Sequence, residues 1–217
     1  MGQAGMAEAA VRYLRSAGTA PGDSATPTGS GVSAGAPAPP VEPLPRPELR
    51  CVGEDERAPV GQAEFRRVLG NFASGVAVVT SPATDGEDGP AGFACQSFSS
   101  LSLDPPLVAF MVGRTSTTWP RIARAGAFCV NVLAAHQGEL CRGFAVSGAD
   151  KFAGVAYDAA PASGSPRLTD TLAWIDCTIH AVHTGGDHLI VVGRVDALGT
   201  GTDEDQAPLL FHKGRFV

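Results

Sequence analysis

The chain has 217 residues, of which 44% are hydrophobic and 18% charged, so it carries enough apolar material for a sizeable core and is not disordered throughout. Its 16 Lys and Arg residues against 22 Asp and Glu residues give a net charge of −6, which argues against a general nucleic-acid binder. No apolar run approaches the roughly 18–20 residues that cross a bilayer, so the sequence predicts no transmembrane helix.

The five cysteines do not form a disulfide or zinc-binding pattern. Their spacings are wide, no CxxC pair occurs, and Cys95, Cys129 and Cys177 lie in apolar runs typical of buried strands. The chain also opens without the charged, apolar and cleavage-site regions of a secretory signal. We therefore expect a cytoplasmic protein.

Residues 1–60 differ in composition from the rest of the chain. Between Ala17 and Pro47 there are eight prolines and five glycines, and no aromatic residue lies between Tyr13 and Phe65. Such a segment cannot bury enough apolar surface to offset its conformational entropy. We expect residues 1–60 to be a disordered and dispensable extension, with a docking arm or targeting element as the alternative, and residues 61–217 to form one domain.

Short helices and strands that cluster as hairpins are predicted for this domain. In chain order we expect a helix at Ala63–Phe72, strands at Gly75–Thr80, Ala91–Phe98 and Leu107–Val112, a helix at Ser116–Ala125, a strand at Phe128–Leu133, a helix at His136–Val146, and strands at Leu172–His183, His188–Leu198 and Pro208–Phe211. The Gly185-Gly186 pair indicates a tight hairpin turn. This order favours an antiparallel barrel over a doubly wound sheet, and neither a Rossmann nor a P-loop motif occurs.

The segment Gly92–Pro106 joins an apolar strand to a Ser-rich turn that stops at Asp104-Pro105-Pro106. Pro105 lacks an N–H group and disfavours the helical conformation at Asp104, so we expect a stiff loop. Hydroxyl and backbone N–H groups beside an apolar strand suit a planar ligand with a polar rim, such as a flavin ring. The alternative is a turn whose hydroxyls satisfy its own backbone.

A second polar segment, Arg114–Arg121, lies between a strand and a helix. The hydroxyls of Ser116 and Thr117 can cap that helix, and Pro120 is tolerated in its first turn. A helix start beside an arginine attracts phosphate, although a well-capped helix without a ligand is an equal alternative.

Histidines gather on the two long strands, where His188 follows the hairpin turn. A surface or packing role is the alternative to a functional role for His188. His180 and His183 differ by three positions in an alternating strand, so they should face opposite sides. The sequence therefore predicts no metal site.

These pieces together resemble the flavin reductase family, the small reductase components of two-component flavin-dependent monooxygenases. The resemblance rests on blocks in the family's order: Phe65–Thr80, Gly92–Leu107, Phe128–Leu133, Lys151-Phe152, Pro166–Leu168, Gly186–His188 and Pro208–Phe216. It covers nearly all of residues 65–217 and none of residues 1–60.

The resemblance implies a mainly β fold, the antiparallel, Greek-key-like FMN-binding split β-barrel with a few short helices, and a homodimer. It implies that NADH or NADPH reduces FAD or FMN and that the reduced flavin passes to a separate monooxygenase. Two alternatives stay open: a flavoprotein of the same fold that retains its flavin as an oxidase, and a non-enzymatic flavin-binding subunit.

Site residues follow from the resemblance by position. Ala94, Gln96 and Ser97 would line the isoalloxazine edge, Arg114 and its neighbours would hold the phosphate, and His188 would lie near the nicotinamide as the catalytic-site residue. The full cofactor-binding set is Phe93, Ala94, Cys95, Gln96, Ser97, Ser99, Ser100, Ser102, Asp104, Arg114, Thr115, Ser116, Thr117, Thr118, Lys151, Phe152, Asp187 and His188. The family often has Thr at position 94 and Asn at position 96, so Ala94 and Gln96 depart from its pattern.

Overall fold

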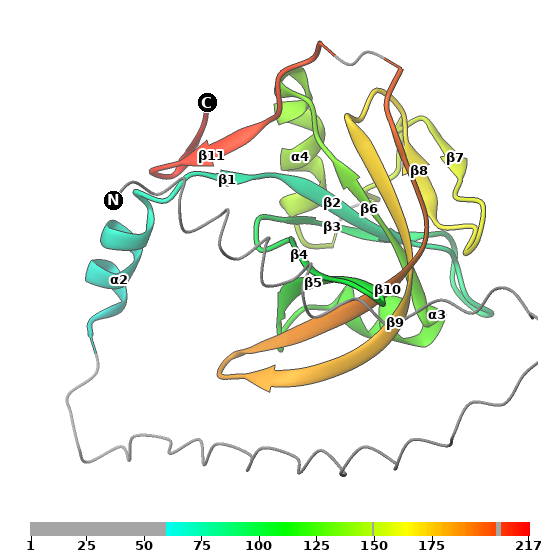
Figure 1. Ribbon diagram of the computed structural model, residues 1–217, viewed down its shortest axis with the longest axis horizontal. Helices are drawn as coiled ribbons and strands as arrows, with labels where there is room; N and C mark the ends of the chain where they lie inside the picture. Colours follow the sequence, from blue (N-terminus) through cyan, green and yellow to red (C-terminus); the bar gives the residue numbers. More distant parts are fainter. Residues whose placement is uncertain (1–59, 149, 203–204) are drawn as a thin grey trace, which may run out of the picture. The chain divides into compact units, whose positions relative to one another are not determined.

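The computed structural model describes residues 60–148, 150–202 and 205–217 (Figure 1). Residues 1–59 of the predicted extension lie outside this part, so the predicted disorder stays a prediction. The elements in order are α2 (Gln62–Leu69), β1 (Ser74–Gly75), β2 (Ala77–Ser81), β3 (Ala91–Cys95), β4 (Ser99–Leu103), β5 (Pro106–Gly113), α3 (Trp119–Ala125), β6 (Ala127–Val132), η1 (Ala135–Gln137), α4 (Gly138–Ala145), β7 (Tyr157–Ala159), β8 (Pro166–Leu168), β9 (Ala173–Gly185), β10 (His188–Thr200), β11 (Leu210–His212) and β12 (Arg215–Phe216).

One antiparallel sheet of seven strands forms the body of the domain, in the order β3-β2-β6-β9-β10-β5-β4. Its two edge strands, β3 and β4, follow one another in the chain, so the sheet curls until its edges lie near each other. No ladder joins β3 to β4. The sheet is therefore a barrel that stays open along one seam, which confirms the predicted mainly β, antiparallel class.

Aromatic side chains fill the inside of the curled sheet. Phe110 on β5 and Phe128 on β6 are fully buried, and their rings meet edge to face with centroids 5.1 Å apart. Phe93 on β3 packs against Phe110 at 5.8 Å. Because these strands lie far apart in the sheet order, the rings join opposite walls of the barrel, and aromatic pairs of this geometry add about 0.5–1.5 kcal/mol each beyond area burial.

The segment after β3 differs from the prediction. Residues 99–103 were expected to be a stiff loop, yet they form β4, which pairs with β5 from Ser99↔Ala109 to Leu103↔Pro106. The period-two pattern of Leu101 and Leu103 was present in the sequence, but both side chains are exposed, so no burial pattern marked the strand. Strand β4 therefore forms because it pairs with the edge of β5, and not because its own residues favour a strand.

The predicted long hairpin is confirmed and extends further than expected. Residues 186 and 187 make the turn between β9 and β10, and Gly186 has φ 68°, a left-handed conformation that favours glycine. In Figure 1 the hairpin projects from the sheet body. Its turn end carries His188, which pairs with Gly113 at the end of β5.

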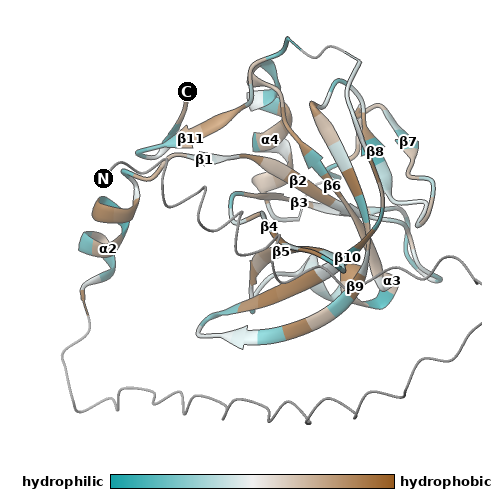
Figure 2. Ribbon diagram, in the orientation of Figure 1, coloured by the Kyte–Doolittle hydropathy of each residue, from teal (hydrophilic) through white to brown (hydrophobic). Residues whose placement is uncertain are grey.

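Helix α2 has an apolar face that the described residues leave open. Phe65, Val68 and Leu69 are exposed to 56%, 49% and 53%, and the helix buries none of its residues. Figure 2 shows hydrophobic positions on this helix beside hydrophilic ones. No helix of the described part is long and apolar enough to cross a membrane.

The four described cysteines, Cys95, Cys129, Cys141 and Cys177, are buried and unpaired. Burial raises the pKa of each thiol, and that of Cys129 to about 12. They therefore act as small apolar residues, as the sequence suggested for three of them.

Candidate active site

A cleft of about 580 Å³ opens where the ends of β3 and β5 meet the start of β10. We call it the main cleft. Its lining consists of Phe93, Ala94, Cys95, Gln96, Ser97, Met111, Val112, Gly113, Thr115, Ser116, Thr117, Thr118, Phe144, Ala145, Ser147, Lys151 and His188. Three segments that the sequence marked separately, residues 93–97, residues 115–118 and His188, thus share one cavity.

Several predicted site residues lie elsewhere. Ser99, Ser100 and Ser102 on β4 and Asp104 in the turn after it do not line the main cleft. Arg114, Phe152 and Asp187 do not line it either. The cause is the pairing of β4 with β5, which holds these serines in the exposed edge strand. The role of these residues around the ribityl chain stays a prediction.

Ser97 fastens the segment after β3 onto β5. Its hydroxyl donates to the carbonyl oxygen of Met111 at 3.0 Å and accepts from the N–H of Met111 at 2.9 Å. The Ser99↔Ala109 register, extended by two residues, puts Ser97 opposite Met111. A side chain thus takes the place of a backbone pair with Met111, and the hydroxyl hydrogen is committed to this contact and not available to a ligand.

His188 stands at the rim of the main cleft with one ring nitrogen already bonded. Its Nδ1 lies 2.8 Å from a carboxylate oxygen of Asp187, and the bond to His188 lowers the pKa of Asp187. An ionised carboxylate only accepts hydrogen bonds, so Nδ1 carries the hydrogen. In the neutral ring, Nε2 is then left as an acceptor.

Lys151 ties two elements together beneath the cleft. Its ammonium donates to the carbonyl oxygen of Gly92 on β3 at 3.1 Å and to that of Phe144 on α4 at 3.0 Å. Partial burial lowers the pKa of this lysine. An ammonium has three N–H donors, so these two bonds leave one for another acceptor.

A second cleft of about 690 Å³ lies next to the main cleft and shares Thr117, Thr118 and Lys151 with it. The rest of its lining is Asp88, Gly89, Pro90, Ala91, Gly92, Arg121, Gly148, Asp150, Phe152 and Tyr157. We call it the second cleft. Phe152, predicted for the site, belongs to this cleft alone.

The polar segment before α3 divides into two parts. Ser116 lines the main cleft, and its hydroxyl accepts from the N–H of Trp119, the first residue of α3, at 3.2 Å. Arg114 is an exposed turn residue whose N–H donates to the carbonyl oxygen of Asp187 at 3.0 Å. The cation that lines the main cleft near Thr117 and Thr118 is Lys151, not Arg114.

Some lining residues were missed by sequence reasoning. They are Met111, Val112 and Gly113 at the end of β5, and Phe144, Ala145 and Ser147 at the end of α4. Ligand sites are common where a strand ends beside a polar loop, so the end of β5 could have been predicted from the sequence to line the cleft. Helix α4 lies close to β3 because Phe144 contacts Gly92. A Cβ at position 92 would lie 2.8 Å from the Phe144 ring, so only glycine allows this contact.

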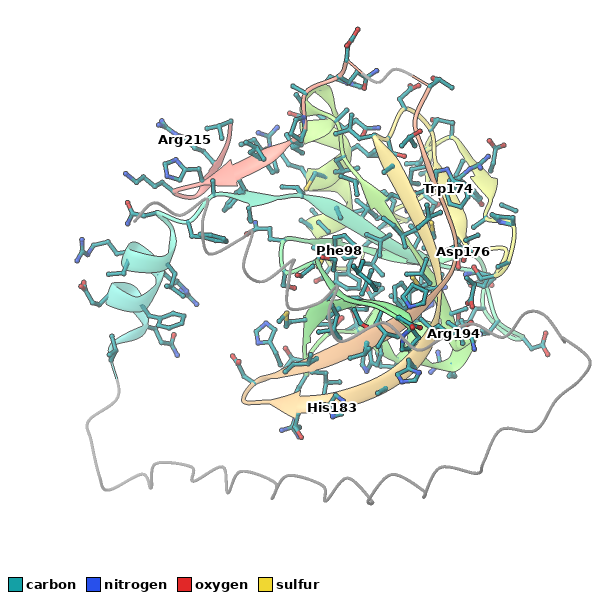
Figure 3. All side chains as sticks on the ribbon, viewed as in Figure 1. Phe98, Trp174, Asp176, His183, Arg194 and Arg215 are labelled. Carbon is teal, nitrogen blue, oxygen red and sulfur yellow. The ribbon has the colours of Figure 1, made fainter. Side chains whose placement is uncertain are left out.

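Other titratable groups lie away from both clefts. Asp176 on β9 is fully buried and accepts from the N–H groups of Ala162 and Ser163 at 2.8 and 3.1 Å, which fixes that loop. Figure 3 shows Asp176 against the sheet body and His183 on the projecting hairpin. Within the described ranges, no three His, Cys, Asp or Glu residues are grouped so that they could hold a metal ion.

Comparison with known proteins gives a consistent result. The model of the flavin reductase like domain matches residues 69–217. The reductase subunit HsaB of a flavin-dependent monooxygenase from Rhodococcus jostii is 49% identical over 154 residues, which cover 70% of this chain and 75% of that protein. A flavin reductase from Pseudomonas putida is 43% identical over 77% of this chain and 95% of its own length.

Solved structures of similar proteins also belong to flavin-dependent oxidoreductase systems. A homologue of nitrilotriacetate monooxygenase component B from Mycobacterium thermoresistibile has a TM-score of 0.68 and 45% identity, covering 72% of this chain and 85% of its own. The NADH:FAD oxidoreductase SgcE6 of Streptomyces globisporus, solved with NAD and FAD fragments, has a TM-score of 0.66 and 35% identity, covering 71% of this chain and 90% of its own.

Proposed function

The chain belongs to the flavin reductase family, and from this premise we propose that its main cleft holds a flavin and a nicotinamide cofactor together. The chain is an NAD(P)H:flavin oxidoreductase that supplies reduced flavin to a partner monooxygenase. The observation that carries the proposed site is the meeting of residues 93–97, residues 115–118 and His188 in one cavity of about 580 Å³. That volume lies within the roughly 300–1,000 Å³ of pockets that take small cofactors.

The residues of the main cleft fit a flavin. Phe93, Ala94 and Cys95 line the main cleft along β3 with apolar groups, which suit the face of a planar ring. Because the Ser97 hydroxyl is bonded to Met111, contacts to the ring edge fall to the exposed Gln96 side chain and to backbone N–H groups. A bound flavin supplies the hydride-accepting ring, and the protein contributes binding and orientation.

His188 is proposed to orient the nicotinamide. Its Nδ1 is bonded to Asp187, and its Nε2 can accept a hydrogen bond from the carboxamide NH₂ group at the rim of the main cleft. Hydride transfer needs no proton from this ring. We therefore assign His188 to positioning the dinucleotide, in agreement with the role that the sequence resemblance implied.

The phosphate end of the flavin is proposed to lie at the wall shared by the two clefts. Thr117 and Thr118 offer hydroxyl groups there, and Lys151 offers a positive charge with one uncommitted N–H. A charge-assisted bond to phosphate contributes about 1.5–3 kcal/mol. Arg114, the cation expected from the sequence, lines neither cleft, and its phosphate role stays a prediction.

We also propose that two copies form a homodimer through the apolar face of α2. Phe65, Val68 and Leu69 on α2 are exposed, and so is Phe72, three residues after the helix ends, at 81%. A contiguous apolar patch of this kind marks an interaction surface more often than a solvated one. The proposed compartment is the cytoplasm, where NAD(P)H is available.

The test of function is direct. Purified protein is mixed with NADH or NADPH and with free FAD or FMN, and oxidation is followed at the nicotinamide absorbance band. We expect turnover that depends on added flavin and reduced flavin that leaves the protein on gel filtration. The two alternatives, an oxidase that keeps its flavin and a non-enzymatic flavin-binding subunit, are not favoured. Turnover without added flavin would support the first, and no turnover with any pairing would support the second.

A further inference from the structure

Met111 is the only methionine among the described residues, since Met1 and Met6 lie before residue 60. It lines the main cleft and is 40% exposed. We infer that Met111 is an oxidation site, at which hydrogen peroxide converts the thioether to a sulfoxide and thereby weakens flavin binding. This inference rests on the proposed place of the flavin in the main cleft.

The strand fixes the direction of the Met111 side chain. Its neighbours along β5, Phe110 and Val112, are buried in the core at 0% and 4% exposure. Successive side chains of a strand point to opposite faces, so Met111 lies on the outer face of the sheet. Its backbone is held on one side by the Ser97 hydroxyl and on the other by the pairing with Ile190 on β10. The thioether is therefore kept on the side that is open to solvent.

The oxidant follows from the activity of the chain. Reduced flavin that no monooxygenase takes up gives two electrons and two protons to dioxygen, which forms oxidised flavin and hydrogen peroxide. The Met111 sulfur then attacks one peroxide oxygen and keeps it as the sulfoxide oxygen. The O–O bond breaks, and the other oxygen leaves as water with both hydrogens. The sulfur loses two electrons and the peroxide gains two.

The other sulfur atoms of the described domain are less accessible than that of Met111. The cysteines Cys95, Cys129, Cys141 and Cys177 are all buried. A thioether is also oxidised without first losing a proton, so its oxidation needs no neighbouring base. Because Cys95 lines the same cleft but is buried, Met111 is the sulfur of the main cleft that is open to solvent.

A sulfoxide changes the chemistry of the cleft lining. Oxidation turns a flexible apolar side chain into a polar one with a hydrogen-bond acceptor. The Ser97 hydroxyl has its hydrogen committed to the Met111 carbonyl oxygen, so the new oxygen depends on water for its hydrogen bonds. A hydrated oxygen beside the apolar groups of Phe93 and Ala94 disfavours the face of a planar ring. Activity then falls when reduced flavin is not consumed, which limits the further use of NAD(P)H.

The test uses the full chain. The protein is incubated with hydrogen peroxide, the peroxide is removed with catalase, and peptides are mapped by mass spectrometry. We expect one added oxygen on the Met111 peptide. In step with it, the Kd for flavin, measured without NAD(P)H by flavin fluorescence, should rise about threefold or more, the scale of placing a polar group against an apolar ligand face. The two methionine sulfoxide reductases, one for each epimer, should restore the Kd.

Met111→Leu is the matched variant, because leucine has a similar volume and the variant retains Met1 and Met6. Whatever Kd and KM it has before treatment, we expect peroxide to leave them unchanged. Met111→Gln places a polar side chain at the site, and its untreated Kd for flavin should be raised like that of the oxidised wild type. During aerobic turnover without a monooxygenase, the wild type should gain oxygen at Met111, and catalase or removal of dioxygen should prevent this.

Several results would overturn the proposal. They are the absence of sulfoxide at Met111 after either treatment, a sulfoxide that leaves the Kd unchanged, an equal effect of peroxide on Met111→Leu, and recovery with dithiothreitol alone, which would assign the effect to a cysteine. A failure of the proposed place of the flavin is distinct, because Lys151→Met would then also leave the Kd unchanged. A failure of the activity itself would leave the untreated wild type without flavin-dependent oxidation of NAD(P)H.

Discussion

The hydroxyl of Ser97 makes both hydrogen bonds that a paired residue on a neighbouring strand would make to Met111, one to its N–H at 2.9 Å and one to its carbonyl oxygen at 3.0 Å. The contact extends the β4–β5 ladder by one side chain and holds the connection between β3 and β4 against β5. Because both residues line the main cleft, the position of that wall depends on this contact.

Replacing Ser97 by Ala should therefore loosen the cleft. The N–H of Met111 loses its acceptor, and a lost hydrogen bond costs about 0.5–1.5 kcal/mol. We expect a lower free energy of unfolding in denaturant titration and a KM for flavin raised several-fold. Ser100→Ala on β4 is the control, because Ser100 does not line the cleft. Equal effects of the two substitutions would contradict the assignment.

His188→Ala should impair the use of NADH and spare flavin binding. Loss of one or two orienting hydrogen bonds predicts a fall in kcat/KM for NADH of about 10–100-fold, measured at saturating flavin. His183 is exposed on the same hairpin, so His183→Ala is the control for general effects of removing an imidazole from this hairpin. Normal NADH kinetics in His188→Ala, or a loss of flavin binding instead, would make His188 a structural residue.

Lys151→Met should weaken the binding of FMN more than that of riboflavin, which lacks the phosphate. Loss of one charge-assisted bond predicts about a tenfold or larger change in the dissociation constant of FMN. Any general loosening of β3 against α4 would affect both ligands, so the difference between them reports the phosphate contact. Arg114→Ala is the comparison, and a larger FMN-specific loss there would restore the assignment made from the sequence.

The apolar face of α2 should control the state of association. Leu69→Asp places a charge on that face, and we expect a monomer in sedimentation velocity at a concentration where the wild type is a dimer. Ala63→Asp adds the same charge on the opposite side of the helix and should leave the dimer intact. A wild-type monomer that turns over would refute the homodimer, and would leave the face for a different protein such as the monooxygenase.

Deleting residues 1–58 should leave the domain folded and active. No predicted site residue lies in this segment, and every core residue named here belongs to the domain that follows. We expect kcat/KM for NADH and the melting temperature to stay within a few-fold and a few degrees of the full chain. Insoluble expression or loss of turnover would show that the extension takes part in folding or binding.

The sequence predicted the large features of the fold because their signals are local. The Gly185-Gly186 pair and the alternating apolar residues before it marked the long hairpin, and β-branched runs marked β2 and β10. Strand β4 was missed because it is stabilised by the edge of β5 and not by burial of its own residues. The short pair β7–β8 was missed for a similar reason, since three residues carry too little periodicity.

The sequence could predict which segments line the candidate site, but not which of their atoms are available to a ligand. Residues 93–97 and 115–118 were identified from their polar groups beside apolar strands, and they do line the main cleft. Which hydroxyls stay free depends on the strand register, and the register of β4 on β5 bonds Ser97 to Met111. Of the second cleft, the sequence marked Thr117, Thr118, Lys151 and Phe152, while the rest of its lining comes from loops and ring contacts that only the folded chain brings together.

The buried cysteines have a consequence for a protein that makes reduced flavin. Reduced flavin in free solution reacts with dioxygen and yields hydrogen peroxide, which oxidises a cysteine through attack by its thiolate and not by its thiol. The pKa of Cys129 is raised to about 12 and that of Cys95, in the wall of the main cleft, is also raised by burial. Both sulfurs therefore stay protonated at neutral pH, and these two thiols are poor targets for an oxidant that arises from the enzyme's own product.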